Sequence, residues 1–259
     1  MRRVQAVEFE DFPWFPAAIR DSMTDFFNFQ MTLFDLYRPA VPLLAEALER
    51  SGHDRIVDLC AGGGGPHGRL GRGLSEALGR PVRTTLTDKF PNLEAFARMR
   101  EEGFGVDFES RPVDAMDVPG DIQGFRTLFS AFHHFPPAAA RAILQDAVDK
   151  GAPIGIFELS HRRPTAFLQV MLGGPVGLLL GTPAMRPQRL SRYLLTYLVP
   201  AIPFFAVWDG VASNLRAYAP DELMELVSGL RSGDGFEWQV GRVKGPAGVL
   251  VTYLIGTPR

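Results

Sequence analysis

Short apolar runs alternate with stretches of helical periodicity along the first 160 residues. Five runs are predicted to be strands: residues 55–60, 82–87, 106–113, 127–132 and 154–159. Between them, apolar residues recur every three or four positions, as they do along one face of a helix. Residues 41–48 have the same spacing and predict a helix before the first strand. Strands that alternate with helices predict a doubly wound, Rossmann-like α/β sheet that is mostly parallel.

The last forty residues predict a different connection. A helix with an acidic first turn follows Pro220, and two further strand-like runs, 236–243 and 249–255, flank a turn at Gly245 and Pro246. Two strands joined by so short a connection are antiparallel. We therefore expect a seven-stranded sheet that ends in an antiparallel hairpin.

An apolar helical insertion interrupts this pattern after the fifth strand. Its two uncharged runs, 167–185 and 193–208, lie on either side of Arg186, Arg189 and Arg192. The pattern divides the chain into an N-terminal helical cap (1–52), a core (53–161 and 214–259) and the insertion (162–213). We expect the insertion to be a lid over the active site, since lids exclude water and enclose apolar substrates.

Contact with a membrane through residues 165–208 is the alternative role for the insertion. The first uncharged run has 19 residues, close to the roughly 20 that a helix needs to cross a bilayer. Gly173-Gly174-Pro175, Pro200 and Pro203 argue against straight spans. Peripheral contact is favoured over spanning. Three arginines in a loop are more often simply solvated, and the alternative is that they face anionic headgroups or a substrate carboxylate.

The N-terminal stretch is unusually rich in aromatic residues. They are Phe9, Phe12, Trp14, Phe15, Phe26, Phe27, Phe29 and Phe34. So much aromatic surface requires a cover. We expect these residues to pack on the sheet as a helical cap, and the alternative makes them part of the substrate pocket.

Composition and charge narrow the class of protein. The 259 residues are 46% hydrophobic and 22% charged, which favours a folded globular chain, and the net charge is −2 with no long basic run, so no nucleic-acid partner is expected. The single cysteine, Cys60, allows no intrachain disulfide and no thiolate metal site, so no metal is predicted and a reducing cytoplasm fits best. The N-terminus does not resemble a secretory signal.

A glycine-rich loop follows the first strand and opens a helix. Asp58 ends the strand, and Gly62 to Gly65 follow two residues after Cys60. Glycine lets a ligand approach the backbone closely. The loop has neither the GxGxxG spacing of dinucleotide enzymes nor the GK[ST] ending of a P-loop, which disfavours ATP and GTP chemistry. Asp88, Asp114 and residues 130–135 follow the next strands, at the edge where open α/β sheets bind ligands.

In its glycine loop and in the residues that follow its strands, the chain resembles the class I S-adenosylmethionine-dependent methyltransferases. Their glycine motif is roughly DLGCGTG where this chain has DLCAGGG from Asp58, and the resemblance covers about residues 40–160 and 215–259. It departs from the family at Cys60, which replaces the usual first glycine. The resemblance implies S-adenosylmethionine as cofactor. The residues that it places around that cofactor are Asp58, Cys60, Ala61, Gly62 and Gly64 at the amino acid part, Asp88 at the ribose, Asp114 and Ala115 at the adenine, and Ser130.

Four residues after the fourth and fifth strands are candidate catalytic residues. His133 and His134 belong to the segment FSAFHHF, which looks like the signature after strand four in small-molecule members of the family. Glu158 and His161, at the end of the fifth strand, are candidate bases for an acceptor proton. Methyl transfer is an in-line displacement in which alignment alone supplies about 7–11 kcal/mol, so a base is not obligatory.

The sequence thus favours methyl transfer to O, N or C of a small hydrophobic molecule such as a lipid, a quinone or a polyketide-like metabolite. The principal alternative is a non-catalytic, methyltransferase-like module that binds a lipid, a membrane or a protein. A third hypothesis is a different enzyme on the same fold, such as an aminopropyl transferase or a nicotinamide oxidoreductase.

Overall fold

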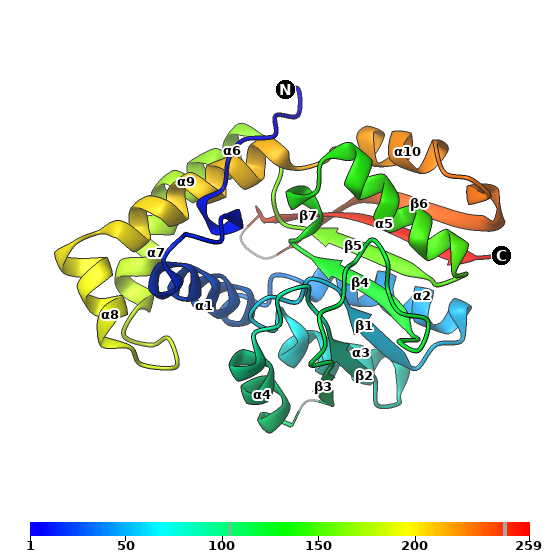
Figure 1. The fold of residues 1–259 in the computed structure, drawn as a ribbon, viewed down its shortest axis with the longest axis horizontal. Coiled ribbons are helices and arrows are strands. Elements are labelled where there is room, and N and C mark those ends of the chain that lie inside the picture. Colours follow the sequence, from blue (N-terminus) through cyan, green and yellow to red (C-terminus); the bar gives the residue numbers. More distant parts are fainter. Residues whose placement is uncertain (104, 246–247) are drawn as a thin grey trace.

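A computed structural model describes residues 1–103, 105–245 and 248–259. Among these residues it contains one seven-stranded sheet in the order β3-β2-β1-β4-β5-β7-β6 (Figure 1). The strands are β1 (Arg55–Asp58), β2 (Arg83–Leu86), β3 (Val106–Phe108), β4 (Phe125–Phe129), β5 (Ile154–Glu158), β6 (Phe236–Lys244) and β7 (Leu250–Pro258). β1 to β5 are parallel, and β7 is antiparallel to both β5 and β6. The predicted doubly wound sheet and terminal hairpin are confirmed; Pro246 of the predicted turn lies outside the described residues.

Several predicted strand boundaries were wrong, most of all those of the third and fourth strands. β3 ends at Phe108 rather than at residue 113, because the chain turns at Glu109 and Arg111, where the Arg111 guanidinium contacts the Glu109 carboxylate at 2.9 Å. β4 begins at Phe125, two residues before the predicted start, and ends at Phe129. Ser130 has φ 47°, a left-handed conformation that cannot continue a strand.

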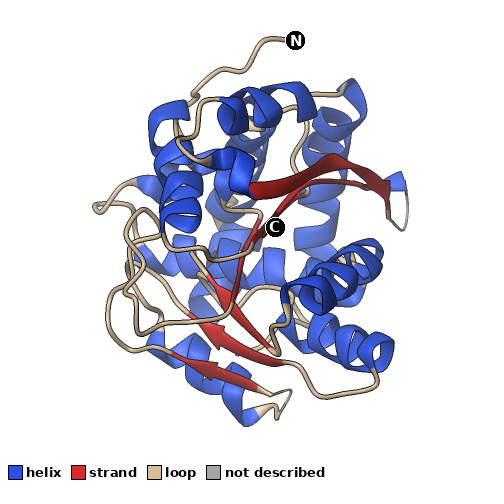
Figure 2. Ribbon diagram, turned by 90° about the vertical axis from the view of Figure 1, so that its right-hand side faces the viewer, coloured by secondary structure: helices blue, strands red, loops and turns tan. Residues whose placement is uncertain are grey.

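Helices cover both faces of the sheet (Figure 2). α2 (Val41–Ser51) and α3 (His67–Leu78) share one buried cluster with Ile56 of β1. α5 (Pro137–Asp149) and α10 (Pro220–Ser228) share the other with the adjacent Val57. Alternate residues of a strand point to opposite faces, so the apolar run of β1 fills two cores. α4 (Leu93–Glu101) packs beside β2 and β3.

The remaining helices form a separate layer, which we call the helical lobe: α1 and residues 164–216 (Figure 1, dark blue and yellow). Its elements are α1 (Ala17–Leu33), α6 (Pro164–Leu168), η4 (Gln169–Gly173), α7 (Gly174–Gly181), α8 (Leu190–Tyr193), η5 (Leu194–Leu198) and α9 (Ala201–Arg216). Short 3₁₀ turns lie at η1 (Phe9–Asp11), η2 (Arg38–Ala40), η3 (Phe132–His134) and η6 (Gly233–Gly235).

The N-terminal aromatic residues pack against the insertion, so the expectation that they cover the sheet was wrong. Phe15 and Phe26 are buried in one cluster with Leu178, Met185 and Ile202 of the insertion. On one face of the sheet, α2 and α3 already share a buried cluster with residues of the strands. The two apolar segments of the sequence therefore cover each other.

The two uncharged runs of the insertion fold differently. The first is one continuous helix from Pro164 to Gly181, because a π-helical stretch, η4, absorbs the irregularity before Pro175. The second bends by 80° between Leu190–Leu198 and Ala201–Arg216. Among the described residues, only the first is by itself long and apolar enough to cross a membrane.

Two of the three arginines between the uncharged runs bind α1. The guanidinium of Arg192, which is fully buried, contacts the carboxylate of Asp25, and Arg189 contacts Asp21 at 3.4 Å. A buried guanidinium requires such a carboxylate. Of these three only Arg186 is exposed, so the expectation that the arginines are solvated was wrong for the buried Arg192.

Candidate cofactor and acceptor site

The glycine loop passes over the carboxyl end of β1 in a left-handed conformation. Cys60, Gly62, Gly64 and Gly65 have φ values of 58°, 54°, 107° and 59°. A Cβ atom added to Gly62 would meet no atom within 4 Å, so open space borders the loop there. Such a backbone favours glycine, which explains why the methyltransferase motif has glycine where this chain has Cys60.

Asp88, after β2, binds the backbone of the glycine loop. Its Oδ2 accepts a hydrogen bond from the Gly62 N–H at 2.9 Å, and its Oδ1 accepts one from the Phe90 N–H at 2.8 Å. Burial raises the pKa of the Asp88 carboxyl, against the effect of these hydrogen bonds. The structure thus brings together Asp88 and Gly62, two residues that the sequence analysis placed around one ligand.

Asp58 is engaged inside the protein. Its Oδ1 accepts a hydrogen bond from the Thr127 hydroxyl at 2.7 Å, and its Oδ2 lies 2.8 Å from Nε2 of His67. All three side chains are fully buried. Asp58 therefore fastens β1 to β4 and to the start of α3, and both of its carboxylate oxygens have protein partners. His67 was missed, since nothing in its spacing marks it as a partner of Asp58.

Burial of the Cys60 side chain raises the pKa of its thiol well above the usual range, and the carboxylates of Asp88, Asp58 and Asp114 act in the same direction. The thiol is therefore neutral and not a nucleophile near pH 7. Ala61, also buried, donates its N–H to the Thr87 carbonyl at 3.0 Å, which anchors the loop to β2.

Asp114 lies beside Lys89 at the next strand end. Its Oδ2 accepts a hydrogen bond from the Lys89 ammonium at 2.7 Å, and its Oδ1 accepts one from the Met116 N–H at 3.0 Å. Burial raises the pKa of Asp114, but these two donors outweigh that effect and the net pKa is lowered. Ala115 is buried among the apolar residues between the sheet and α5.

Ser130, directly after β4, contacts a buried tyrosine. Its hydroxyl lies 2.7 Å from the Tyr37 hydroxyl, and Tyr37 also donates to the Phe157 carbonyl at 3.3 Å. Burial raises the pKa of Tyr37 well above its usual value, so Tyr37 stays neutral. Tyr37, 93 residues away in sequence, was not predicted.

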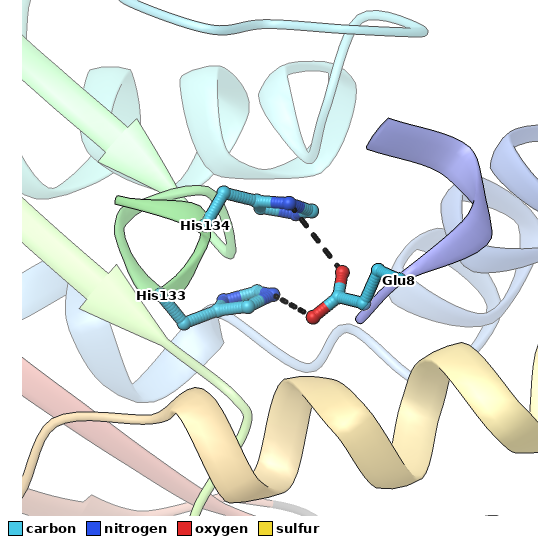
Figure 3. A group of neighbouring side chains, drawn as sticks. All are labelled: Glu8, His133 and His134. Atoms are coloured by element: carbon cyan, nitrogen blue, oxygen red, sulfur yellow. Dashed lines mark ion pairs between the residues drawn. The ribbon is translucent and has the colours of Figure 1, made fainter. Parts of the chain in front are cut away.

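His133 and Glu158 form a buried pair at the ends of β4 and β5 (Figure 3 shows His133 beside Glu8). Nδ1 of His133 lies 2.6 Å from Oε2 of Glu158, and Oε1 of Glu158 accepts the Phe132 N–H at 2.7 Å. Both oxygens of Glu158 are therefore used to orient neighbouring groups. Nε2 of His133 remains, and its nearest carboxylate oxygen is that of Glu8 at 4.0 Å.

His134, the next residue, belongs to an ion cluster. Its Nδ1 lies 2.9 Å from Asp11 and 3.4 Å from Glu8. Burial lowers the pKa of His134, but Asp11, Glu8 and Glu10 outweigh burial and raise it to about 10. His134 is consequently protonated near neutral pH and cannot accept a proton.

Glu8, His133 and His134 lie close enough to hold a metal ion, with one ligand atom from each within 4.8 Å of the others (Figure 3). The guanidinium of Arg216, however, lies 3.2 Å from Glu8 and 2.7 Å from Asp11. Arg216 and the protonated His134 already supply positive charge to these carboxylates. The absence of a metal remains a prediction.

His161, after β5, is buried, and its backbone N–H donates a hydrogen bond to Oδ1 of Asn214 at 3.0 Å. Burial lowers the pKa of His161, with Arg163 and Arg242 acting in the same direction, so its ring is neutral. The structure does not bring it into hydrogen bonding with His133, His134 or Glu158.

The helical lobe and the N-terminal segment close this end of the sheet. The Phe9 and Glu10 N–H groups donate to the two carboxylate oxygens of Asp209 of α9, at 2.8 and 3.1 Å. On the other side, Asn28 of α1 donates to the Gly63 carbonyl at 3.0 Å. Glu8, Asp11 and Arg216 were not predicted from the sequence, because their contacts join residues roughly 120 to 210 positions apart and leave no local signal.

Solved structures share this fold at low sequence identity. Magnesium protoporphyrin IX methyltransferase (ChlM) from Synechocystis, with S-adenosylmethionine bound, is 10% identical; the match covers 99% of this chain and 100% of that one, with a TM-score of 0.51. A candidate O-methyltransferase from Nostoc punctiforme is 14% identical over 98% of this chain and 64% of that one (TM-score 0.51). PigF, with S-adenosylhomocysteine, is 16% identical over 95% and 62% (TM-score 0.50).

The chain thus spans less than two thirds of the length of the Nostoc protein and PigF. No protein-family model matches the chain. No curated protein matches it in sequence. The resemblance to class I methyltransferases is confirmed at the level of the fold.

Proposed function

We propose that the protein transfers a methyl group from S-adenosylmethionine to O, N or C of a small apolar molecule. The observation that carries the proposal is the pair formed by Asp88 and Gly62. A carboxylate and a left-handed glycine, 2.9 Å apart, border open space at the carboxyl ends of β1 and β2. Open α/β sheets bind nucleotide-like ligands outside this edge of the sheet. The fold shared with solved methyltransferases supports the same reaction.

The residues present fit this cofactor. Asp88 offers acceptor oxygens to the ribose hydroxyls, and Asp114, with a lowered pKa, offers one to the adenine amino group beside Ala115. Asp58 is fully buried, whereas Asp88 and Asp114 are half-buried at the edge of the sheet. We therefore assign the amino acid part to the backbone of the glycine loop, with Asp58 as its support. When bound, S-adenosylmethionine supplies an electrophilic methyl group on a sulfonium.

His133 is the residue that we assign as general base. Glu158 holds its Nδ1 and leaves Nε2 to take the proton that the acceptor gives up when it is methylated. Glu158 acts through His133 and is a positioning residue. His134 is excluded by its charge. His161 is neutral but lies outside this cluster, so we assign it no role in proton transfer.

The helical lobe supports an apolar acceptor. α1 contacts both the glycine loop, through Asn28, and the apolar cluster of the insertion, through Phe26. An acceptor that enters between the loop and the lobe would meet aromatic and aliphatic side chains, the usual lining of small-molecule sites. The insertion would then act as a lid over the core at residues 53–161 and 214–259.

A non-catalytic module remains the second candidate function. Glu8 and η1 cover the free ring nitrogen of His133 in the described conformation, and Asp209 and Arg216 fasten that cover. A module of this kind would fold normally without binding the cofactor.

Calorimetry with S-adenosylmethionine and S-adenosylhomocysteine tests the proposal. Asp88→Ala should weaken binding about 10- to 100-fold, since hydrogen bonds to a charged group contribute about 1.5–3 kcal/mol. Asp117→Ala is the matched control: its side chain contacts only Lys150 among charged groups, and it should bind as the unmodified protein does. Folded protein that binds neither ligand would contradict the proposal and favour the module.

A further inference from the structure

Exposed apolar side chains are concentrated on the helical lobe. Of 22 large apolar side chains exposed among the described residues, 13 lie between residues 168 and 208. They are Leu168, Met171, Leu172, Val176, Leu179, Leu180, Leu190, Leu194, Tyr197, Leu198, Val199, Phe204 and Trp208. Together they present on the order of 1,000 Å², whereas the largest apolar patch of a typical monomer is about 300–600 Å². The lobe therefore exposes far more apolar surface than a water-facing lid needs.

The exposed residues of the first insertion helix form a stripe. Leu168, Leu172, Val176 and Leu180 recur every four residues, which places them on one side of the helix. The opposite side packs inward, where Leu178 is fully buried against α1. Only 17% of the segment Pro164–Gly181 is buried. The uncovered stripe faces away from the protein.

The charges of the lobe favour a lipid over a protein as the covering partner. Residues 164–208 contain three arginines and no Asp, Glu or Lys. Arg189 and Arg192 are neutralised by Asp21 and Asp25, whereas Arg186 is exposed and makes no ion pair among the described residues. A stripe with the composition of a membrane helix and one free cation suits hydrocarbon next to phosphate headgroups.

We propose that the helical lobe binds the surface of a lipid bilayer, with the exposed face of residues 164–208 in the interface. Exposed Tyr197, Phe204 and Trp208 suit that depth, because aromatic side chains prefer the boundary between headgroups and hydrocarbon. This inference does not depend on the proposed methyl transfer.

Binding in the plane of the membrane agrees with the packing better than spanning does. Within the lobe, the inner face of residues 164–208 is attached to α1 through Asp21 and Asp25. The second apolar segment bends by 80°, and α9 buries Asp209 and Arg216 against the N-terminal segment. Crossing would place these ionic contacts in hydrocarbon, at a large cost in free energy.

Vesicle flotation of the full chain tests this surface. The protein should float with phosphatidylcholine vesicles, and more strongly when phosphatidylglycerol is included. Leu180→Glu and Leu198→Glu place a carboxylate on the exposed face and should each lower the bound fraction about tenfold. Met224→Glu is the matched control, because Met224 is a partly exposed apolar residue of α10, outside the lobe; it should float as the unmodified protein does.

Four results would overturn the proposal. One is an absence of flotation with either vesicle. Another is equal flotation of Leu180→Glu and Met224→Glu. The third is a lipid-free dimer, seen by analytical ultracentrifugation and abolished by Leu180→Glu, which would assign the face to a second copy of the chain. Protein that resists alkaline extraction from the vesicles would contradict binding in the plane and indicate a span.

Discussion

The sheet and the helical lobe are similarly rich in apolar residues but cover them differently. Every residue of β4 and β5 is buried, and both faces of these strands are packed with helices. The first insertion helix buries one side against α1 and leaves the other open. The sheet thus uses its apolar residues for stability, whereas the lobe retains a surface that its own folding does not use. That difference indicates that the lobe has a partner or substrate of its own.

The buried carboxylates of the two regions also have different roles. At the carboxyl ends of the strands, the Asp58 carboxylate contacts Thr127 and His67 and supports the glycine loop. The Glu158 carboxylate contacts His133 and orients its imidazole. In the lobe, the carboxylates of α1 neutralise arginines of the insertion. We therefore expect substitutions at the sheet end to affect chemistry and those in the lobe to affect packing. Four predictions test this division.

The largest effect is expected for His133, the proposed general base. His133→Ala should lower kcat for an identified acceptor by about 10²- to 10⁴-fold, the usual contribution of a positioned base, and leave cofactor binding unchanged. Steady-state kinetics with calorimetry of the same variant provides the measurement. His161→Gln is the control and should retain activity; if both variants lose activity equally, proton transfer is not assigned to His133.

The buried ion pair of the lobe should dominate its stability. Arg192→Met removes the nearer cation of Asp25 and leaves only Arg189, at 3.9 Å, beside this carboxylate. The variant should lower the free energy of unfolding by about 3 kcal/mol, measured by urea denaturation. The double variant Arg192→Met, Asp25→Leu removes both charges and should recover most of the loss. A single variant as stable as the unmodified protein would show that the pair contributes little.

The cluster where the lobe meets the sheet end should make stability depend on pH. The pKa of His134 is raised to about 10, so its ion pairs stabilise the protein fully below pH 6.5 and are lost as pH rises through 10. Burial would raise the pKa of Asp11, but His134 and Arg216 outweigh it and lower the pKa to about 2, so that contribution is lost only as pH falls through 2. His134→Gln should remove about 2 kcal/mol of stability at pH 6 and much less at pH 10. Thermal unfolding at both pH values measures the difference; equal losses would refute an ionic role.

The smallest effect is expected in the glycine loop. Cys60 occupies a left-handed conformation with φ 58°, which costs a residue with a side chain about 1–2 kcal/mol. Cys60→Gly should relieve that strain and raise the free energy of unfolding by about 1 kcal/mol, since the lost packing of the thiol offsets part of the gain. Chemical denaturation, with Gly62→Ala as the opposite change at φ 54°, gives the comparison. A destabilised Cys60→Gly would mean that packing outweighs strain.

Local patterns predicted the strands to within a few residues, since alternation and apolar runs are properties of neighbouring positions. They also placed Asp58, Asp88, Asp114 and His133 at one edge of the sheet, because parallel strands present their carboxyl ends together. The turn at Glu109 and the left-handed Ser130 were missed, as each depends on a side-chain contact or a backbone conformation that composition does not reveal.

The sequence by itself determined the sheet, its order of elements and the residues at its binding edge, because these follow from periodicity and chain topology. Only the tertiary structure decided which of two adjacent histidines is held by Glu158 and which is protonated beside Asp11. It alone paired Arg192 with Asp25 and turned one face of the insertion toward solvent. His133 and Glu158 are 25 residues apart, and the other two pairs, His134 with Asp11 and Arg192 with Asp25, are more than 100 residues apart. No local pattern encodes the proximity and desolvation of such groups.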